Sequence, residues 1–264
     1  MSTATSPSLP NRHGMFIWYE YLAADVDAAA DFYGRVMGWQ AVPVAPVPDA
    51  YRRFEIGGQG VGGLARRVPG PGPCWLGYIG VEDVDATVER VRAEGGGVHV
   101  PPTDIPGIGR FAMVNDPQGA VFHVMRGASA EPSQAFSPGR VGHASHNELH
   151  TRESAKAFAF YRAVFGWNAH EAMDMGPLGT YQLFGTSAGE PLGGMMDSPN
   201  FPRPCWLTYF NVDEIGAAEA RVRSAGGQVL HGPEEVPGGD WILQCLDSQG
   251  AMFALSGPRA TGAA

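Results

Sequence analysis

The sequence predicts an α+β protein made of four β-α-β-β-β modules arranged in two tandem pairs. Two long stretches of the chain each occur twice, and the same order of strand-like and helix-like segments follows every copy. A repeat of about a hundred residues has the size of a domain, whereas solenoid repeats are much shorter. With 264 residues, 44% of them apolar, the chain can bury two cores of ordinary size.

The first repeat is WYEYLAADVDAAADFYGRVMGW at 18–39, which returns as HNELHTRESAKAFAFYRAVFGW at 146–167. Glu20 thereby aligns with Glu148, 128 positions later. The second repeat begins with CWL at Cys74 and again at Cys205, 131 positions later. The match is too dense for chance composition, so we interpret the chain as a duplicated unit.

The first module opens with a strand over 16–22, rich in aromatic residues. Asp25 is a suitable N-cap for a helix whose apolar stripe at helical spacing ends before Gly38. Proline, aspartate and glycine then separate three predicted strands at 41–47, 52–57 and 60–67.

The second module repeats this order, with a strand at 75–81 and a helix at 84–94 that Gly95 closes. Three strands follow at 98–100, 110–115 and 120–125, the last two joined by the turn DPQG, which DSQG matches near the end of the chain. The expected divisions are domain 1 at 13–126 (modules 13–66 and 73–126), a linker at 127–140, and domain 2 at 143–257 (modules 143–197 and 204–257).

Composition favours a small-molecule substrate over a macromolecular partner. The net charge of −9 argues against nucleic acid, whose phosphates are neutralised by Lys and Arg. The chain shows neither a long apolar run nor a signal-peptide pattern, so we expect a cytoplasmic protein without a membrane partner. We expect a monomer or a homodimer.

The opening strand, the helix that carries Phe-Tyr and closes on Gly-Trp, and the terminal DPxG hairpin resemble the vicinal oxygen chelate superfamily. This superfamily includes glyoxalases, extradiol dioxygenases and bleomycin-resistance proteins. The resemblance covers 13–126 and 143–257, and its tandem form is similar to the branch described as hydroxylase-like or glyoxalase-like. It implies that each pair of modules forms a curved mixed sheet, a cup backed by helices. The fold alone does not determine the activity.

The resemblance also marks where metal-dependent members carry their ligands. On the opening strands the corresponding residues are Trp18, Leu76, His146 and Leu207, and on the closing strands they are His123 and Ala254. Each half thus keeps one candidate ligand, whereas a zinc or iron site needs three or four N or O donors. We expect no metal cofactor, although a divalent metal stays possible. If modules two and three paired instead, His123 and His146 would share one cup.

The remaining polar residues suggest acid–base chemistry. Because side chains alternate along a strand, His146, Glu148 and His150 share one face, as do Trp18 and Glu20. A glutamate among apolar and aromatic side chains has a raised pKa, and histidine titrates near neutrality. The tyrosines could steady an enolate oxygen. The predicted catalytic residues are His146, Glu148, Tyr209, Glu20 and His123.

A second set is predicted to contact the substrate: Trp18, Tyr78, Leu207, Met195, Met252 and His150, the last at the rim. Structural roles are the alternative for several of these residues. Glu20 and Glu148 recur in both halves and could accept backbone N–H bonds, and the methionines could fill gaps in the core.

The functional hypothesis is an enzyme that performs metal-independent acid–base chemistry on a bulky aromatic secondary metabolite such as a polyketide. Dehydration, isomerisation and an aldol-type lyase or cyclase step are the reactions expected. The alternatives are an antibiotic-binding self-resistance protein without catalysis and a metal-dependent glyoxalase or dioxygenase. The second-half cup is expected to be the main site.

Overall fold

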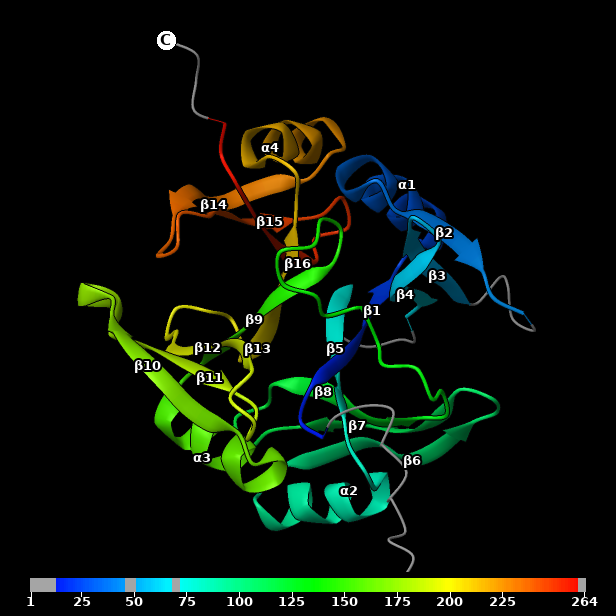
Figure 1. Cartoon of the computed structure of the whole chain (residues 1–264), viewed down its shortest axis with the longest axis vertical. Coiled ribbons are helices and arrows are strands. Elements are labelled where there is room, and N and C mark those ends of the chain that lie inside the picture. Colours follow the sequence, from blue (N-terminus) through cyan, green and yellow to red (C-terminus); the bar gives the residue numbers. More distant parts are fainter. Residues whose placement is uncertain (1–12, 46–50, 68–71, 261–264) are drawn as a thin grey trace, which may run out of the picture.

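The structure is a computed structural model that describes residues 13–45, 51–67 and 72–260. It consists of two eight-stranded mixed sheets, one from each half of the chain, with one α-helix in every module (Figure 1). This confirms the predicted α+β fold of four modules in two tandem pairs. Within the described ranges, no helix combines the length and the apolar character that crossing a bilayer requires.

The first sheet has the strand order β2-β3-β4-β1-β5-β8-β7-β6. Its elements are β1 Phe16–Ala23, α1 Val26–Met37, β2 Gln40–Pro43, β3 Tyr51–Ile56, β4 Gln59–Arg66, β5 Cys74–Gly80, α2 Val84–Ala93, β6 Gly97–Ile105, β7 Gly109–Asn115 and β8 Val121–Gly127.

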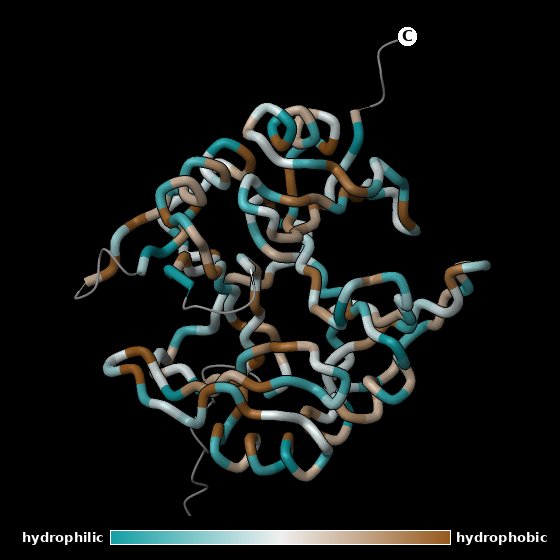
Figure 2. Tube along the Cα trace, turned by 180° about the vertical axis from the view of Figure 1, so that it is seen from behind, coloured by the Kyte–Doolittle hydropathy of each residue, from teal (hydrophilic) through white to brown (hydrophobic). Residues whose placement is uncertain are grey.

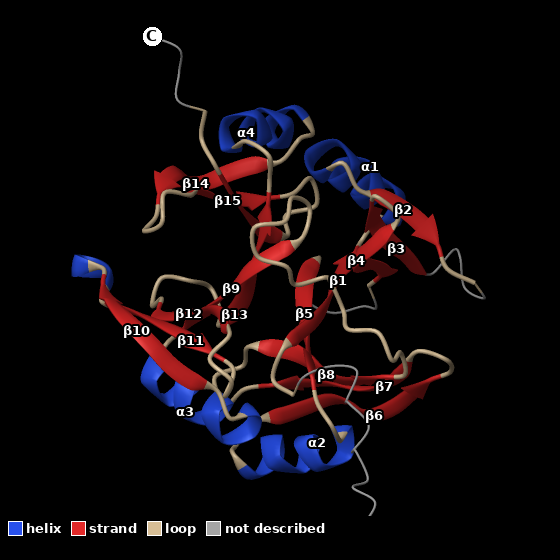
Figure 3. Cartoon of the chain, in the orientation of Figure 1, coloured by secondary structure: helices blue, strands red, loops and turns tan. Residues whose placement is uncertain are grey.

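The second sheet has the equivalent order β10-β11-β12-β9-β13-β16-β15-β14 (Figure 3). Its elements are β9 Ala144–Thr151, α3 Ser154–Phe165, β10 Asn168–Asp174, the 3-10 turn η1 Gly176–Leu178, β11 Thr180–Gly185, β12 Pro191–Asp197, β13 Cys205–Asn211, α4 Ile215–Ser224, β14 Gln228–Glu235, β15 Trp241–Leu246 and β16 Met252–Gly257.

The opening strands of the two modules in each half pair antiparallel at the centre of the sheet: β1 with β5, and β9 with β13. Modules one and two therefore share a sheet, as do modules three and four. The alternative pairing of modules two and three is wrong, and His123 and His146 lie in different sheets.

Strand β6 is longer than the predicted 98–100 because two consecutive prolines do not end it. It is an edge strand, where a missing N–H costs no ladder bond, and its register to β7 shifts twice along its length. Strand β2 covers the start of the predicted 41–47; residues 46 and 47 lie outside the described residues.

A glutamine of the opposite half contacts the residue in front of the first helix in each half; for α1, Gln249 Oε1 accepts the N–H of Asp25 at 2.8 Å. The side chain of Asp25 accepts the Asp27 and Ala28 N–H groups at the start of α1, and Gly38 ends that helix in the left-handed region. Helix α3 lacks such a cap. Gln118 of the first half instead accepts the N–H of Glu153, at 2.9 Å, in front of that helix.

The two halves also share one hydrophobic core, which contains side chains from both sheets and all four helices. Helix α1 lies beside α4, and α2 beside α3, at opposite ends of the molecule (Figure 1). Along the helices, apolar residues alternate with hydrophilic ones, as expected for helices with one face in this core (Figure 2).

Reciprocal hydrogen bonds accompany this packing. Tyr33 donates to Asp247 at 3.0 Å, and Tyr161, its counterpart, donates to Asp116 at 3.2 Å. Both carboxylates belong to the closing turns of the opposite half. The core therefore takes one face of each sheet; we call the other face of each sheet its inner face.

Candidate functional site

The inner face of domain 2 carries a polar cluster around β9. Strand alternation turns Leu149 into the shared core, and Asn147 receives a hydrogen bond from Tyr19 of the first half at 3.0 Å. His146, Glu148 and His150, which alternate with these two residues along β9, face the other way, as the sequence predicted.

Glu148 is the centre of this cluster and is buried. Its Oε2 accepts hydrogen bonds from the hydroxyls of Tyr181, at 2.9 Å, and Tyr209, at 3.2 Å. Its Oε1 accepts one from Gln244 Nε2 at 3.2 Å and lies 2.7 Å from His150 Nε2. Both carboxylate oxygens are thus held by the protein.

These contacts reverse the pKa shift that burial alone would produce at Glu148. Desolvation raises the pKa of this carboxyl, but the His150 contact, the His146 charge and the Tyr181 hydrogen bond together bring it below its ordinary value. The expectation of a raised pKa is wrong here. Glu148 is an ionised carboxylate at neutral pH.

His146 reaches Glu148 through Tyr181 rather than directly. Its Nε2 lies 2.6 Å from the Tyr181 hydroxyl oxygen. Because that hydroxyl gives its proton to Glu148, the His146 Nε2 must carry the proton of this contact. The result is a relay in the order His146, Tyr181, Glu148. Burial lowers the pKa of His146, although the Glu148 charge opposes the shift.

His150 is not at the rim. It is 3% exposed, its Nδ1 lies 2.8 Å from Ser198 Oγ, and its ring stacks on Phe201 with centroids 3.8 Å apart. Arg152 holds this covering loop by donating to the carbonyls of Ser198 and Phe201, among others. The prediction that His150 contacts substrate at the rim is therefore wrong; this ring supports Glu148.

Tyr209 and Leu207 lie on the inner face but are almost completely buried. The Tyr209 hydroxyl donates to Glu148 and accepts from Gln244 Nε2 at 2.9 Å, so its proton is committed. This contradicts the predicted oxyanion role. Leu207 packs in a small apolar cluster with Tyr209 and Ala254, against which Met252 also packs.

Met195 was expected to contact substrate and does not. It is fully buried in the shared core, on the opposite side of the sheet from Glu148. Its register partner on the neighbouring strand is Leu149, another core residue. Met195 fills the core, the alternative role that the sequence left open.

The inner face of domain 1 carries the equivalent carboxyl with different neighbours. Tyr78 donates a hydrogen bond to Glu20. The Tyr51 hydroxyl lies over Gly63, the register partner of Glu20, and receives a hydrogen bond from Trp18 Nε1 at 3.2 Å. Burial raises the pKa of Glu20 to about 7, and the Tyr78 bond opposes this only in part. The expected raised pKa is therefore found in this half.

His123 also lies on the inner face of domain 1, 1% exposed, with its ring stacked on Tyr78 at a centroid distance of 4.1 Å. Its Nδ1 is buried and has no hydrogen-bond partner among the described residues. Burial lowers the pKa of His123 to about 3, so the ring is neutral. It contacts Tyr78 as an aromatic neighbour.

Sequence reasoning missed three members of these clusters: Tyr51, Tyr181 and Gln244. The two tyrosines occupy matching places, since each side chain lies over a glycine, Gly63 or Gly194, that pairs with the glutamate. Extending the repeat comparison to the third strand of the odd modules would have matched these tyrosines. Gln244 stands where domain 1 has Met113, so the repeat gave no signal for it.

The residues present do not fit the metal site of this fold. The marked positions hold Trp18, Leu76 and His123 in one sheet, and His146, Leu207 and Ala254 in the other. Glu148 already accepts four contacts from protein groups. Among residues 13–45, 51–67 and 72–260, no three His, Cys, Asp or Glu side chains are grouped to hold an ion.

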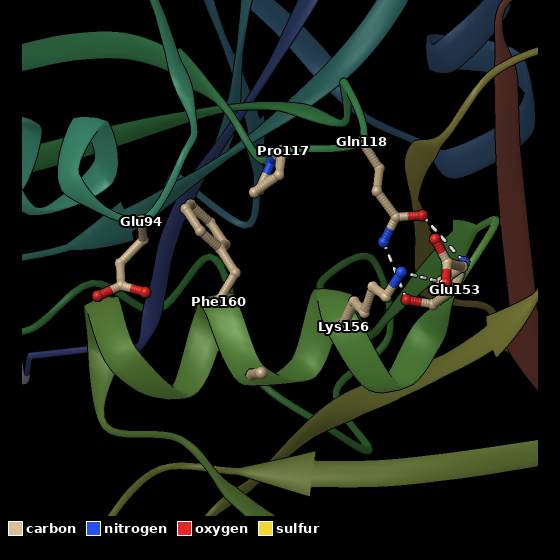
Figure 4. Close-up of a pocket in the computed structure, with 7 residues that line it drawn as sticks. Glu94, Pro117, Gln118, Glu153, Lys156 and Phe160 are labelled. Atoms are coloured by element: carbon tan, nitrogen blue, oxygen red, sulfur yellow. Dashed lines mark hydrogen bonds and ion pairs between the residues drawn. The ribbon is translucent and has the colours of Figure 1, made fainter.

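A surface pocket of about 450 Å³ lies elsewhere, between the DPQG turn and α3 (Figure 4). Its polar groups bind one another: Lys156 pairs with Glu153 at 2.7 Å, and Gln118 Nε2 donates to the Glu153 carbonyl at 2.9 Å. This pocket includes none of the inner-face residues. Its Gln118–Glu153 contact joins the two halves, whereas the Lys156–Glu153 pair lies within the second half.

The profile of the glyoxalase/bleomycin resistance protein/dioxygenase superfamily matches residues 16–124 and 140–255, which is most of the chain.

Two curated relatives align with nearly all of the sequence. A Mycobacterium tuberculosis protein with the provisional name glyoxylase CFP32 is 33% identical over 94% of this chain and 96% of its own length. The anthracycline biosynthesis protein DauV from Streptomyces is 32% identical over 90% of this chain and 91% of its own length.

Solved structures share the fold at lower identity. The Mn(II)-bound glyoxalase from Novosphingobium aromaticivorans has a TM-score of 0.67 at 18% identity and covers 94% of this chain and 83% of its own. A homoprotocatechuate 2,3-dioxygenase variant from B. fuscum has a TM-score of 0.66 at 14% identity, covering 98% and 75%.

Proposed function

Because this chain belongs to the glyoxalase/bleomycin resistance protein/dioxygenase superfamily, we propose that its relay serves an enzyme that moves protons on an aromatic polyketide-like metabolite. Relatives named for anthracycline biosynthesis, DauV and DnrV, support this class of substrate. The observation that carries the proposal is the chain of contacts from His146 through Tyr181 to the ionised Glu148.

In this proposal His146 is the base. Its Nδ1 makes no hydrogen bond to a described residue, and its lowered pKa keeps the ring neutral at pH 7. His146 removes a proton from a carbon next to a substrate carbonyl, which leaves an enolate and an imidazolium. The negative charge of Glu148, transmitted through Tyr181, stabilises that imidazolium.

The proton then returns to a different atom of the same substrate. Delivery to another carbon completes an isomerisation, and delivery to a departing hydroxyl completes a dehydration that expels water. An aldol-type closure follows when the enolate carbon attacks a second carbonyl, whose oxygen receives the proton. All three outcomes balance without an oxidant or reductant, and the residues need no metal for them.

In this mechanism Tyr209, His150 and Gln244 are positioning residues, because each fixes the Glu148 carboxylate. Trp18, Glu20, Tyr78 and His123 lie on the other sheet and take no part in this step. This asymmetry supports the assignment of proton transfer to domain 2.

The test is hydrogen–deuterium exchange on an anthracyclinone that carries a methyl ketone side chain. We expect the EDTA-treated protein in D2O to accelerate the replacement of hydrogen by deuterium on the carbon next to the ketone. NMR measures the rate of this exchange. The His146→Ala variant should lose this acceleration by about 100-fold or more. Glu20→Gln is the matched control and should retain it. Exchange at an unchanged rate in His146→Ala would refute the proposal.

Antibiotic sequestration without catalysis is the second candidate. The observation that favours it is the aromatic inner face of domain 1, where Trp18 is partly exposed and lies beside Tyr51. Under this candidate the anthracyclinone binds, quenching tryptophan fluorescence, and its exchange rate stays at the buffer value. The same titration and NMR experiment therefore separates the two functions.

A further inference from the structure

Domain 1 presents a carboxyl group, that of Glu20, among aromatic rings on its inner face. Glu20 is partly exposed, and the neighbouring side chains on the inner face are Trp18, Tyr51 and Tyr78. No Lys or Arg side chain in the described ranges forms an ion pair with Glu20; the nearby Arg53 instead pairs with Glu55. A carboxylate in this setting lacks an opposite charge to offset the free-energy cost of removing it from water.

In the other half of the chain, a histidine nitrogen is the partner of the equivalent carboxylate. In domain 2 the equivalent Glu148 has the nitrogen of His150 2.7 Å from its Oε1. The repeat places Leu22 at the position of His150 and Trp18 at the position of His146. Domain 1 therefore has the carboxyl and its two tyrosines, but neither imidazole: Leu22 and the indole of Trp18 stand in their places.

We propose that the inner face of domain 1 binds an organic ammonium ion, with Glu20 as its counter-ion and the rings of Trp18, Tyr51 and Tyr78 around it. Aromatic faces attract cations, most strongly from tryptophan, and the attraction increases when the cation is desolvated. The proposed nitrogen takes the part that the His150 imidazole plays in domain 2. This site is independent of the proton-transfer reaction proposed for domain 2.

The other groups on this face are compatible with a cation. His123, behind Tyr78, is neutral because burial lowers its pKa to about 3. Cys74, beside Leu22 on the neighbouring strand, has a raised pKa, chiefly from burial, and is an uncharged thiol at neutral pH. The Arg53–Glu55 pair on β3 is neutral in sum. Glu20 is thus the group on this face that changes charge near pH 7.

Binding should therefore be linked to ionisation of Glu20. With a pKa of about 7, the ionised fraction is about 0.1 at pH 6 and about 0.9 at pH 8. A permanent cation that binds the ionised form should bind about tenfold more tightly at pH 8 than at pH 6. An uncharged ligand that accepts a hydrogen bond from protonated Glu20 should show the opposite trend.

The probes are choline, a permanent cation, and 3,3-dimethylbutan-1-ol, which has the same shape without the charge. NMR titration of the full chain at both pH values measures their dissociation constants. We expect choline to show the tenfold change, and dimethylbutanol to bind weakly and no more tightly at pH 8 than at pH 6. Glu20→Gln should remove the pH dependence, and Trp18→Leu should weaken choline binding at both pH values.

Glu148→Gln is the matched control, and it should leave choline binding unchanged. The inference is overturned if choline does not bind saturably, binds equally at both pH values, or binds more tightly at pH 6. It is also overturned if Glu148→Gln weakens choline as much as Glu20→Gln does, because the cation would then lie in domain 2.

Discussion

Glu20 and Glu148 occupy the same position in the two halves of the chain, each beside a pair of tyrosines, yet their pKa values are shifted in opposite directions. Burial raises the pKa of the first to about 7. The pKa of the second is lowered chiefly because His150 and His146 stand where domain 1 has Leu22 and Trp18. Two carboxyl groups with divergent pKa values commonly have different tasks.

Replacing Tyr181 by Phe should slow proton transfer by about 100-fold or more, because the relay between His146 and Glu148 loses its bridging hydroxyl. The measurement is the ketone exchange rate by NMR. Tyr51→Phe makes the same change in domain 1 and should leave the rate unaltered. Equal rates in both variants would remove Tyr181 from the mechanism.

Replacing Gly194 by Ala should have a similar effect without removing any polar group. A Cβ at this position would lie 2.1 Å from the Tyr181 ring, so the ring must move away from Glu148. Gly63→Ala is its counterpart and displaces Tyr51 in the same way. We expect only Gly194→Ala to reduce exchange, while both variants keep a wild-type circular dichroism spectrum.

The exchange rate should rise with pH and reach half of its maximum below pH 6.5, the ordinary pKa of histidine. The reason is that burial lowers the pKa of His146, and the base acts only in its neutral form. A pH–rate profile measures the position of this rising part of the curve, which we call its acidic limb. In Glu148→Gln the charge that raises the His146 pKa is gone, so the limb should move to lower pH; a limb fixed at its original position would contradict this coupling.

Glu20 should make the protein less stable as pH rises. A carboxyl whose folded pKa is raised binds more protons when folded than when unfolded between pH 4.5 and about 7, so the free energy of unfolding falls across that interval and is level above it. Glu20→Gln should remove this slope and, at pH 8, stabilise the protein by on the order of 1 to 3 kcal/mol. Urea unfolding at pH 5 and pH 8 measures both effects, with Glu55→Gln as an acidic control on the same face.

Elemental analysis of protein purified without chelators should find iron, manganese and zinc well below one ion per chain. The positions that would supply the ligands hold leucine, alanine and tryptophan besides single histidines. Ketone exchange should also survive EDTA. A stoichiometric metal, whose removal abolished exchange, would support the metal-dependent alternative.

The repeat and the alternation of side chains were enough to predict the four modules and the shared face of His146 and Glu148. Residues brought in by other strands were beyond that reasoning, because the register that places Gln244 beside Glu148 is set by pairing across the sheet. His150 was misplaced because the loop that lays Phe201 on its ring has no periodic signal. Met195 was misplaced because it follows two glycines, which leave no side-chain alternation to assign its face.

The crossed bonds from Tyr33 to Asp247 and from Tyr161 to Asp116 bear on how this architecture arose. A single copy of the unit would expose the sheet face that now packs in the shared core, and its tyrosine hydroxyl would lack the aspartate that accepts from it. A second copy covers that face and provides the aspartate. Linking two copies in one chain makes this contact intramolecular. Once the two copies no longer had to be identical, one could acquire histidines while the other lost the need for them.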